Sequence, residues 1–386
     1  MKRDVLLVGL CSLAITLAAG RVRADVVTDK AASILVFPRV IAADGLDTII
    51  QITNVSNNLV HARCFYVDSR LPPGCAVADP RVGCVPSWSE TDFSIWLTRR
   101  QPTHWLVSTG RPVDPTDNSA IEFSTMQPQV ASPQDGAGLD PGAIPPVPDG
   151  FTGELKCVQV MADGTPIGAN SLIGEATIDS LDGSSDLSKY NAIGIQGSEL
   201  VGASGNILLL NRPSDGSRDG EYNACPAALL LNHFADGAPD PASLRITSTS
   251  ITLVPCSEDF ERQAPSSVTV QFEIFNEFEE RFSTSTTVTC WANIELYEID
   301  SPNDPQSSVF SYQQLGSLVA QTRITPASDL DGAVIGIAET GRTAASTPGE
   351  EAILEGRAAV NIYTRGDRFL GTDGAAFDQI VLPEQF

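Results

Sequence analysis

DTIIQITNVSNNLVHARCFYV, from Asp47 to Val67, alternates apolar and polar residues on both sides of a turn that contains Asn54. A second such stretch, VTVQFEIFNEFEERFSTSTTVTCWANIELYEI, runs from Val268 to Ile299. Successive side chains of a strand point to opposite faces, so this period of two predicts half-buried strands and does not fit helical spacing. We expect each stretch to form a β-hairpin, with a cysteine on the apolar face of its return strand.

A second pair of similar segments closes each half of the chain. Residues 151–178 read as a strand, an Asp-Gly turn and a strand, which is typical of a hairpin. Residues 356–382 align with them so that Val360 falls at the position of Cys157. We expect the two halves to be copies of one module, of which only the first has both Cys64 and Cys157.

The length of 386 residues allows two or three domains of roughly 100 to 200 residues each. We predict an all-β fold of two tandem antiparallel β-sandwich domains with long Pro/Gly-rich loops. The expected domains are residues 25–180 and 244–386, with an irregular junction carrying extra strands at residues 181–243.

Residues 1–24 read as a secretory signal peptide. Lys2 and Arg3 precede an apolar run from Val5 to Ala19, and small residues around Ala24 form a cleavage site. No later stretch approaches the roughly 20 apolar residues of a membrane span. We expect a secreted, soluble protein, located in the periplasm, at the cell surface or outside the cell.

The composition is strongly acidic, with a formal net charge of −24. Attraction to nucleic acid or anionic lipid needs basic patches, so we expect neither nucleic-acid binding nor membrane insertion. High acidity generally serves solubility, and binding of cations is the alternative.

Seven cysteines follow the signal segment: Cys64, Cys75, Cys84, Cys157, Cys225, Cys256 and Cys290. In an exported protein these are disulfide candidates, and their odd number leaves at least one unpaired. We expect Cys64 to pair with Cys157 across two core strands, and Cys75 to pair with Cys84 within a Pro-rich loop. Cys225 and Cys256 can pair with each other, which leaves Cys290 as a buried thiol; alternatively, Cys256 pairs with Cys290.

Acidic loops are the candidate metal sites. Calcium needs several oxygen ligands from a turn, and two Asp-Gly segments supply carboxylates. The candidate ligands are Asp179, Asp182 and Asp186 in the first segment and Asp329 and Asp331 in the second. Neither segment matches a complete calcium-binding loop, and plain turns are the alternative. Calcium is therefore the one cofactor that the sequence suggests.

Trp88, Trp96 and Trp105 are the candidate ligand-binding residues, because exposed aromatic rings often mark binding sites for sugars or partners. Packing against a second sheet face or a neighbouring domain is the alternative for aromatic residues on sandwich strands.

Catalytic motifs give little support to an enzyme. A hydrolase would need His104 or His233 beside a serine and a carboxylate, and the zinc-protease motif H-E-x-x-H is absent from the sequence. Residues 202–206, GASGN, lack the final glycine of a nucleophile elbow. We expect a protein without catalytic activity.

The alternating strands, the Cys64-to-Cys157 spacing and the closing segments resemble bacterial immunoglobulin-like β-sandwich proteins over residues 33–180 and 244–382. The resemblance implies secretion and a role at the cell surface. We predict a structural or adhesion protein that presents loops Asp68–Glu90 and Arg111–Gly150 to a protein or glycan partner. The alternatives are a carbohydrate-binding module and a secreted hydrolase.

Overall fold

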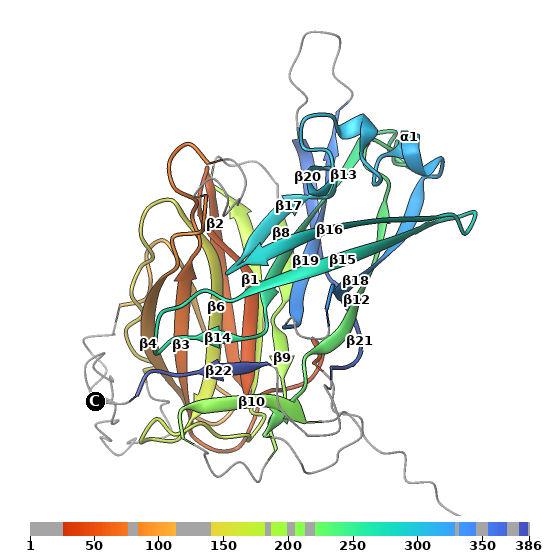
Figure 1. The fold of residues 1–386 in the computed structure, drawn as a ribbon. Helices are drawn as coiled ribbons and strands as arrows, with labels where there is room; N and C mark the ends of the chain where they lie inside the picture. Colours follow the sequence, from red (N-terminus) through yellow and green to blue (C-terminus); the bar gives the residue numbers. More distant parts are fainter. Residues whose placement is uncertain are drawn as a thin grey trace, which may run out of the picture.

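Strands form almost all of the regular structure in the computed structural model (Figure 1). The structure describes residues 26–75, 84–112, 140–181, 187–198, 205–212, 221–328, 332–344, 354–368 and 378–384. Within these residues the helical segments are short: η3 (Leu296–Ile299), η4 (Pro305–Ser307) and α1 (Tyr312–Leu315). The predicted all-β class is confirmed, and the signal segment lies outside the described residues.

The first half folds nine strands into two layers around one core. The first layer has the order β4-β3-β6-β1-β9 and the second the order β5-β2-β7-β8. The layers join at the β1–β2 hairpin, where Ala42 pairs with Asp47 and Ala43 with Leu46, and at an isolated bridge between Ala32, before β1, and Leu172 of β7. The strands are β1 (Ile34–Ala43), β2 (Leu46–Asn54), β3 (Val60–Asp68), β4 (Ser89–Leu97), β5 (Pro102–Leu106), β6 (Phe151–Val160), β7 (Leu172–Ser180), β8 (Leu187–Asn191) and β9 (Ile193–Ile195).

The second half repeats this arrangement. Its sheets have the orders β16-β15-β18-β12-β21 and β17-β13-β19-β20, and a second apolar core lies between them. Its strands are β12 (Pro226–Phe234), β13 (Ile246–Pro255), β15 (Ser267–Asn276), β16 (Arg281–Thr289), β17 (Ala292–Glu295), β18 (Val319–Pro326), β19 (Val334–Thr343), β20 (Leu354–Asn361) and β21 (Tyr363–Asp367). Matching β1 with β12, β2 with β13 and β3 with β15 reproduces the pairings within each layer, and all of these pairs are antiparallel. The β1–β2 pairing between layers is not repeated between β12 and β13 among the described strands.

The strand partners differ from the predicted hairpins in three of four cases. β15 and β16 pair directly, so the hairpin expected from residue 268 onward is confirmed. β2 pairs with β5 and β7, whereas β3 pairs with β4 and β6, so the first predicted hairpin is wrong. The same is true of the two closing segments, because β6 and β7 lie in different layers, as do β20 and β21. An alternating pattern specifies which side chains point inward, but it does not specify which strand lies alongside.

The match between the halves therefore also differs from the predicted one. The strand that corresponds to β6 is β18, not β20, so Val360 is not the counterpart of Cys157. The strands of the second half that correspond to β3 and β6 are β15 and β18. They carry Phe272 opposite Ile324, and both are apolar residues of the second core.

A third layer covers the outer face of the first sheet. It is a four-stranded sheet of order β11-β10-β22-β14, and Figure 1 shows β10, β22 and β14 crossing strands of the first layer. These strands are β10 (Ile207–Arg212), β11 (Tyr222–Asn223), β14 (Glu258–Asp259) and β22 (Gln379–Val381). Apolar residues on both surfaces form another buried cluster, among them Phe65 of β3, Val158 of β6 and Ile380 of β22. With the first core on one face and this cluster on the other, every residue of β3 is buried, including His61 and Arg63, whose face the sequence pattern marks as polar.

The three predicted disulfides are confirmed. Cys64 bonds to Cys157, Cys75 to Cys84 and Cys225 to Cys256, and Cys290 is a buried free thiol. Cys64 and Cys157 lie directly opposite each other on adjacent strands of one sheet. The bridge of antibody domains instead connects two sheets.

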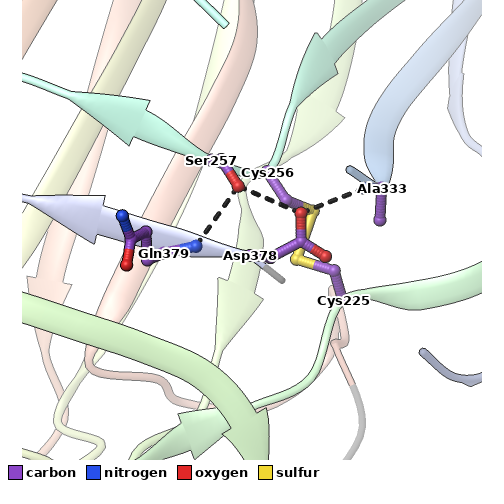
Figure 2. The surroundings of a disulfide bond; sticks show 6 residues. All are labelled: Cys225, Cys256, Ser257, Ala333, Asp378 and Gln379. Atoms are coloured by element: carbon purple, nitrogen blue, oxygen red, sulfur yellow. Dashed lines mark hydrogen bonds between the residues drawn. A yellow bond between two sulfur atoms is a disulfide. The ribbon is translucent and has the colours of Figure 1, made fainter. Parts of the chain in front are cut away.

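The Cys225–Cys256 bridge anchors the second half beside the third layer (Figure 2). Asp378, next to this bridge, accepts hydrogen bonds from the Ala333 amide and the Ser257 hydroxyl, at 3.0 and 3.1 Å. The Gln379 amide donates to the same hydroxyl at 3.2 Å. These bonds hold the beginning of β22 in place, so residues near position 380 are fixed against strands more than a hundred residues earlier.

Candidate functional site

The outer face of the β5-β2-β7-β8 sheet carries the candidate site. Side chains alternate along these strands, so every second residue points away from the first core. The inward set is apolar and buried: Ile50, Ile52, Trp105, Ala176 and Tyr190. The outward set is mostly polar.

Four outward side chains form one row across the four strands. Gln51 is paired with His104 of β5 on one side and with Glu175 of β7 on the other. Glu175 is in turn paired with Asn191 of β8. Directly opposite residues have Cβ atoms about 4.5 to 5.5 Å apart, so neighbours in this row can contact the same ligand.

A surface pocket of about 650 Å³ lies over this row. Asp29, from the segment before β1, lines the pocket together with the whole row. Ile173, which is 42% exposed, and Pro102 add an apolar surface. Lys189 lies beside Glu175, with its Nζ 2.7 Å from the Oε1 atom. Amide, imidazole and carboxylate groups around a small apolar surface are suited to a ligand that has many hydroxyl groups.

The sequence gives no local signal for this site. Gln51 and Glu175 sit on strands where polar residues alternate with apolar ones, and such residues usually form a solvated face. The strand partners bring them together, and those partners come from segments more than a hundred residues apart. Among the residues of the row, only His104 has a side chain that sequence reasoning singles out as chemically active.

The candidate ligand-binding tryptophans are buried, which counts against the prediction that they bind a ligand. Trp105 points into the first core and donates to the Tyr66 hydroxyl. Trp88 lies under the third layer and donates to Glu258 Oε1 at 2.7 Å. Trp96 is buried against the ring of His61. The alternative prediction, packing against a covering layer, describes them correctly.

The stacked pair of Trp96 and His61 is a titratable element of the core. The two rings are 4.0 Å apart and nearly parallel, and His61 Nδ1 lies 3.0 Å from the Met161 carbonyl oxygen. Burial lowers the pKa of His61 to about 4, against the opposing effect of the Met161 hydrogen bond, and the nearby Arg63 lowers it further. His61 is therefore neutral in the folded protein above that pH.

Replacing His61 with Phe is expected to reduce the loss of stability in mild acid. The unfolded protein binds a proton at this imidazole as the pH falls below about 6.5, while the folded protein does so only near pH 4. Wild-type stability therefore decreases from pH 6.5 downward, and Phe keeps the ring stack without titrating. Urea unfolding should show that the difference in stability between pH 7.5 and pH 5 shrinks by about 1 to 2 kcal/mol. An unchanged difference would contradict this reasoning.

The acidic loops give no assembled metal site among the residues described. Asp179 lies on β7, whereas Asp182, Asp186, Asp329 and Asp331 fall outside the described residues. Within the described ranges, no group of three or more His, Cys, Asp or Glu side chains is placed to hold a metal ion. Calcium binding by these loops stays a prediction.

The histidines proposed for a hydrolase lie in different environments. His104 lines the surface pocket, where the hydroxyl groups nearby are those of Thr28, Thr53 and Thr103. His233 is buried in the second half, with its Nε2 2.8 Å from the Thr322 hydroxyl. Within the described residues, no serine lines the pocket beside His104 or hydrogen-bonds to the His233 ring, and the hydrolase alternative stays a prediction.

The two predicted contact loops are partly packed against the first half. In the second loop, Arg111 and Ile144 exchange backbone hydrogen bonds, and Val147 is buried. Residues 76–83 and 113–139 of these loops lie outside the described residues.

In the part of the chain that is described, no helix is long and apolar enough to cross a membrane.

Comparison with known proteins does not identify the site, so its function is inferred from the chemistry of its residues. No model of a protein family matches the chain, and no curated protein matches it.

Proposed function

We propose that the protein is a secreted, non-catalytic adhesion or interaction protein of the bacterial cell envelope or exterior. In this proposal its two halves are tandem immunoglobulin-like sandwiches, and the first half binds a glycan on its β5-β2-β7-β8 face. The observation that carries the proposal is the row of Gln51, His104, Glu175 and Asn191 across the floor of a 650 Å³ pocket. Three intramolecular disulfides support an oxidising compartment.

The negative charge of the pocket and of the chain limits which glycans can bind there. Asp29 and Glu175 are the carboxylates of the pocket, and the whole chain has a net charge of −24. Sialylated or sulfated sugars would be repelled, whereas neutral sugars can donate hydroxyl hydrogens to these carboxylates. The ligand of this proposal is a neutral oligosaccharide, with Ile173 and Pro102 against its apolar face.

A glycan array probed with the purified protein tests the proposal, and the affinity of Gln51→Ala then locates the site. Gln51 is exposed at the centre of the row, so its loss should remove hydrogen bonds to the ligand and leave the fold intact. We expect binding of a neutral glycan to weaken about 10-fold, which corresponds to about 1.4 kcal/mol.

Gln321→Ala is the matched control, because Gln321 is an exposed glutamine on a strand of the second half. It should bind the glycan as the wild type does. Binding of sialylated glycans alone, or equal affinities for wild type and Gln51→Ala, would refute the proposed site.

A further inference from the structure

Strand β16 is an open edge of the second half. It lies at the end of the sheet of order β16-β15-β18-β12-β21, and among the described residues its only strand partner is β15. Its nine residues pair with β15 in an unbroken register, from Thr289 opposite Ser267 to Arg281 opposite Phe275. The backbone N–H and C=O groups on the other side of β16 are therefore left without strand partners. Figure 1 shows the turn of the β15–β16 hairpin projecting beyond the neighbouring strands.

The corresponding edge of the first half is covered. β4 has the place of β16 in that sheet, with β3 as its strand partner. On the free side of β4, the Trp96 amide donates to the Pro141 carbonyl oxygen at 3.0 Å. The described part of the second half supplies no such segment to β16. The repeat has thus kept the edge strand and left its free side uncovered.

The residues of β16 also lack the features that usually protect an edge strand. Natural edge strands are commonly interrupted by proline, bulges or charges, which prevent pairing with another chain. β16 has no proline and no register shift, and its only charged residue is Arg281, at one end. Glu273, on the neighbouring strand, is paired with Arg281 and Arg323. In a chain with 48 acidic and 24 basic residues, this edge lets a second copy approach without opposing carboxylates on the paired strands.

The sequence of β16 is complementary to itself in an antiparallel alignment. A second copy of the strand, centred on Ser285, places apolar residues opposite apolar ones and hydroxyl residues opposite hydroxyl ones. The facing pairs are Phe282 with Val288, Ser283 with Thr287, and Thr284 with Thr286. Arg281 faces Thr289, so no like charges are opposed. Facing pairs of these kinds stabilise antiparallel sheets.

We propose that two copies of this chain associate through β16, in an antiparallel seam that joins their five-stranded sheets into one continuous sheet. The seam forms about eight to ten hydrogen bonds between backbone groups that otherwise face water. Its two-fold symmetry uses the same edge of both copies, so the assembly ends at a dimer. The seam is on the second half and the glycan pocket on the first, so this dimer goes beyond the proposed function.

Sedimentation equilibrium of the purified protein, with its disulfides intact, is the first test. We expect a concentration-dependent equilibrium between one chain and two. Ser285→Lys places two positive charges opposite each other on the axis, and it should weaken dimerisation at least about 10-fold. Ser285 is exposed, so this variant should fold as the wild type does. A wild-type protein that stays a monomer at every concentration overturns the proposal.

Gln271→Lys is the matched control for the added charge. Gln271 is exposed on β15, directly opposite Ser285 and one strand further from the edge. Across the seam its two copies are about 14 Å apart, which exceeds the Debye length of about 8 Å at physiological salt. This variant should dimerise as the wild type does. Equal weakening by the two lysines overturns the proposed seam.

A cysteine on the axis tests the alignment of the strands. In Ser285→Cys the two substituted positions face each other with Cα atoms about 4.5 to 5.5 Å apart, which a disulfide can bridge. We expect this dimer to become covalent in mild oxidant, and Cys290 is buried and should not contribute. Ser283→Cys is the control, because its two copies lie about 13 Å apart along the seam and should stay unlinked. A dimer that Ser283→Cys links and Ser285→Cys does not overturns the proposal.

Discussion

Removing the Cys64–Cys157 bridge is expected to lower the free energy of unfolding by about 4.7 kcal/mol, by the entropy of the loop that it closes. The two cysteines are 93 positions apart in the sequence and are both fully buried on adjacent core strands. Without the bond, the unfolded chain gains the conformations that this long loop now excludes. Guanidinium unfolding of Cys64→Ala/Cys157→Ala, followed by tryptophan fluorescence, measures the change.

The Cys75–Cys84 bridge provides the comparison. Its cysteines are only 9 positions apart and are half-buried. Cys75→Ala/Cys84→Ala should therefore lose only about 2.7 kcal/mol in the same entropy model. Equal losses for the two double variants, or a larger loss for the short ring, would show that loop closure does not determine the contribution of these bonds.

Arg39→Met is expected to cost about 3 to 5 kcal/mol, because it leaves a buried carboxylate without its counter-ion. Arg39 of β1 and Glu339 of β19 form an ion pair of 2.7 Å with side chains 7% and 4% exposed. Arg39 also donates to Asn293 at 2.6 Å, and Glu339 accepts from the Ser188 hydroxyl at 2.7 Å. The pair connects the two halves of the chain, so its loss weakens their interface as well as the local structure.

Two further variants distinguish the cost of leaving a buried charge unpaired from the cost of losing an arginine side chain. Arg281→Met removes an arginine that is 58% exposed beside Glu273, and it should cost no more than about 1 kcal/mol. Arg39→Met combined with Glu339→Leu removes both buried charges and should recover most of the stability lost in the single variant. Chemical unfolding at pH 7 measures all three. A cost below about 1 kcal/mol for Arg39→Met would contradict this account.

The sequence was sufficient to predict most strands, because alternation is local, and the pairs Cys64–Cys157 and Cys75–Cys84. It left two possible partners for Cys256, and the structure pairs this residue with Cys225. Cys64 shares the apolar face of its strand, and the first core confirms that placement. The pairing of the strands could not be predicted in the same way. The turn after Asn54 carries the chain from one layer to the other, and nothing in its residues distinguishes such a crossing from a hairpin.

Burial on the second face of a sheet was equally hard to predict. Trp88 is buried against Glu258 and Phe260, which lie some 170 positions further along the chain, so its local sequence does not reveal its burial. Lys156 and Glu258 also contact each other between the first sheet and its covering layer, although they are 102 positions apart in the sequence. The candidate pocket shares this property, since its row of side chains exists only once four strands have aligned in register.

The third layer also constrains the order in which the protein can be completed during synthesis. Strand β22, at residues 379–381, pairs with both β10 and β14 over the first sheet. Until those residues emerge from the ribosome, the apolar outer face of β3 and β6 lacks part of its cover. A nascent chain paused before this point exposes an apolar surface of the kind that chaperones bind, so the late addition of β22 is a step of folding that is open to aggregation.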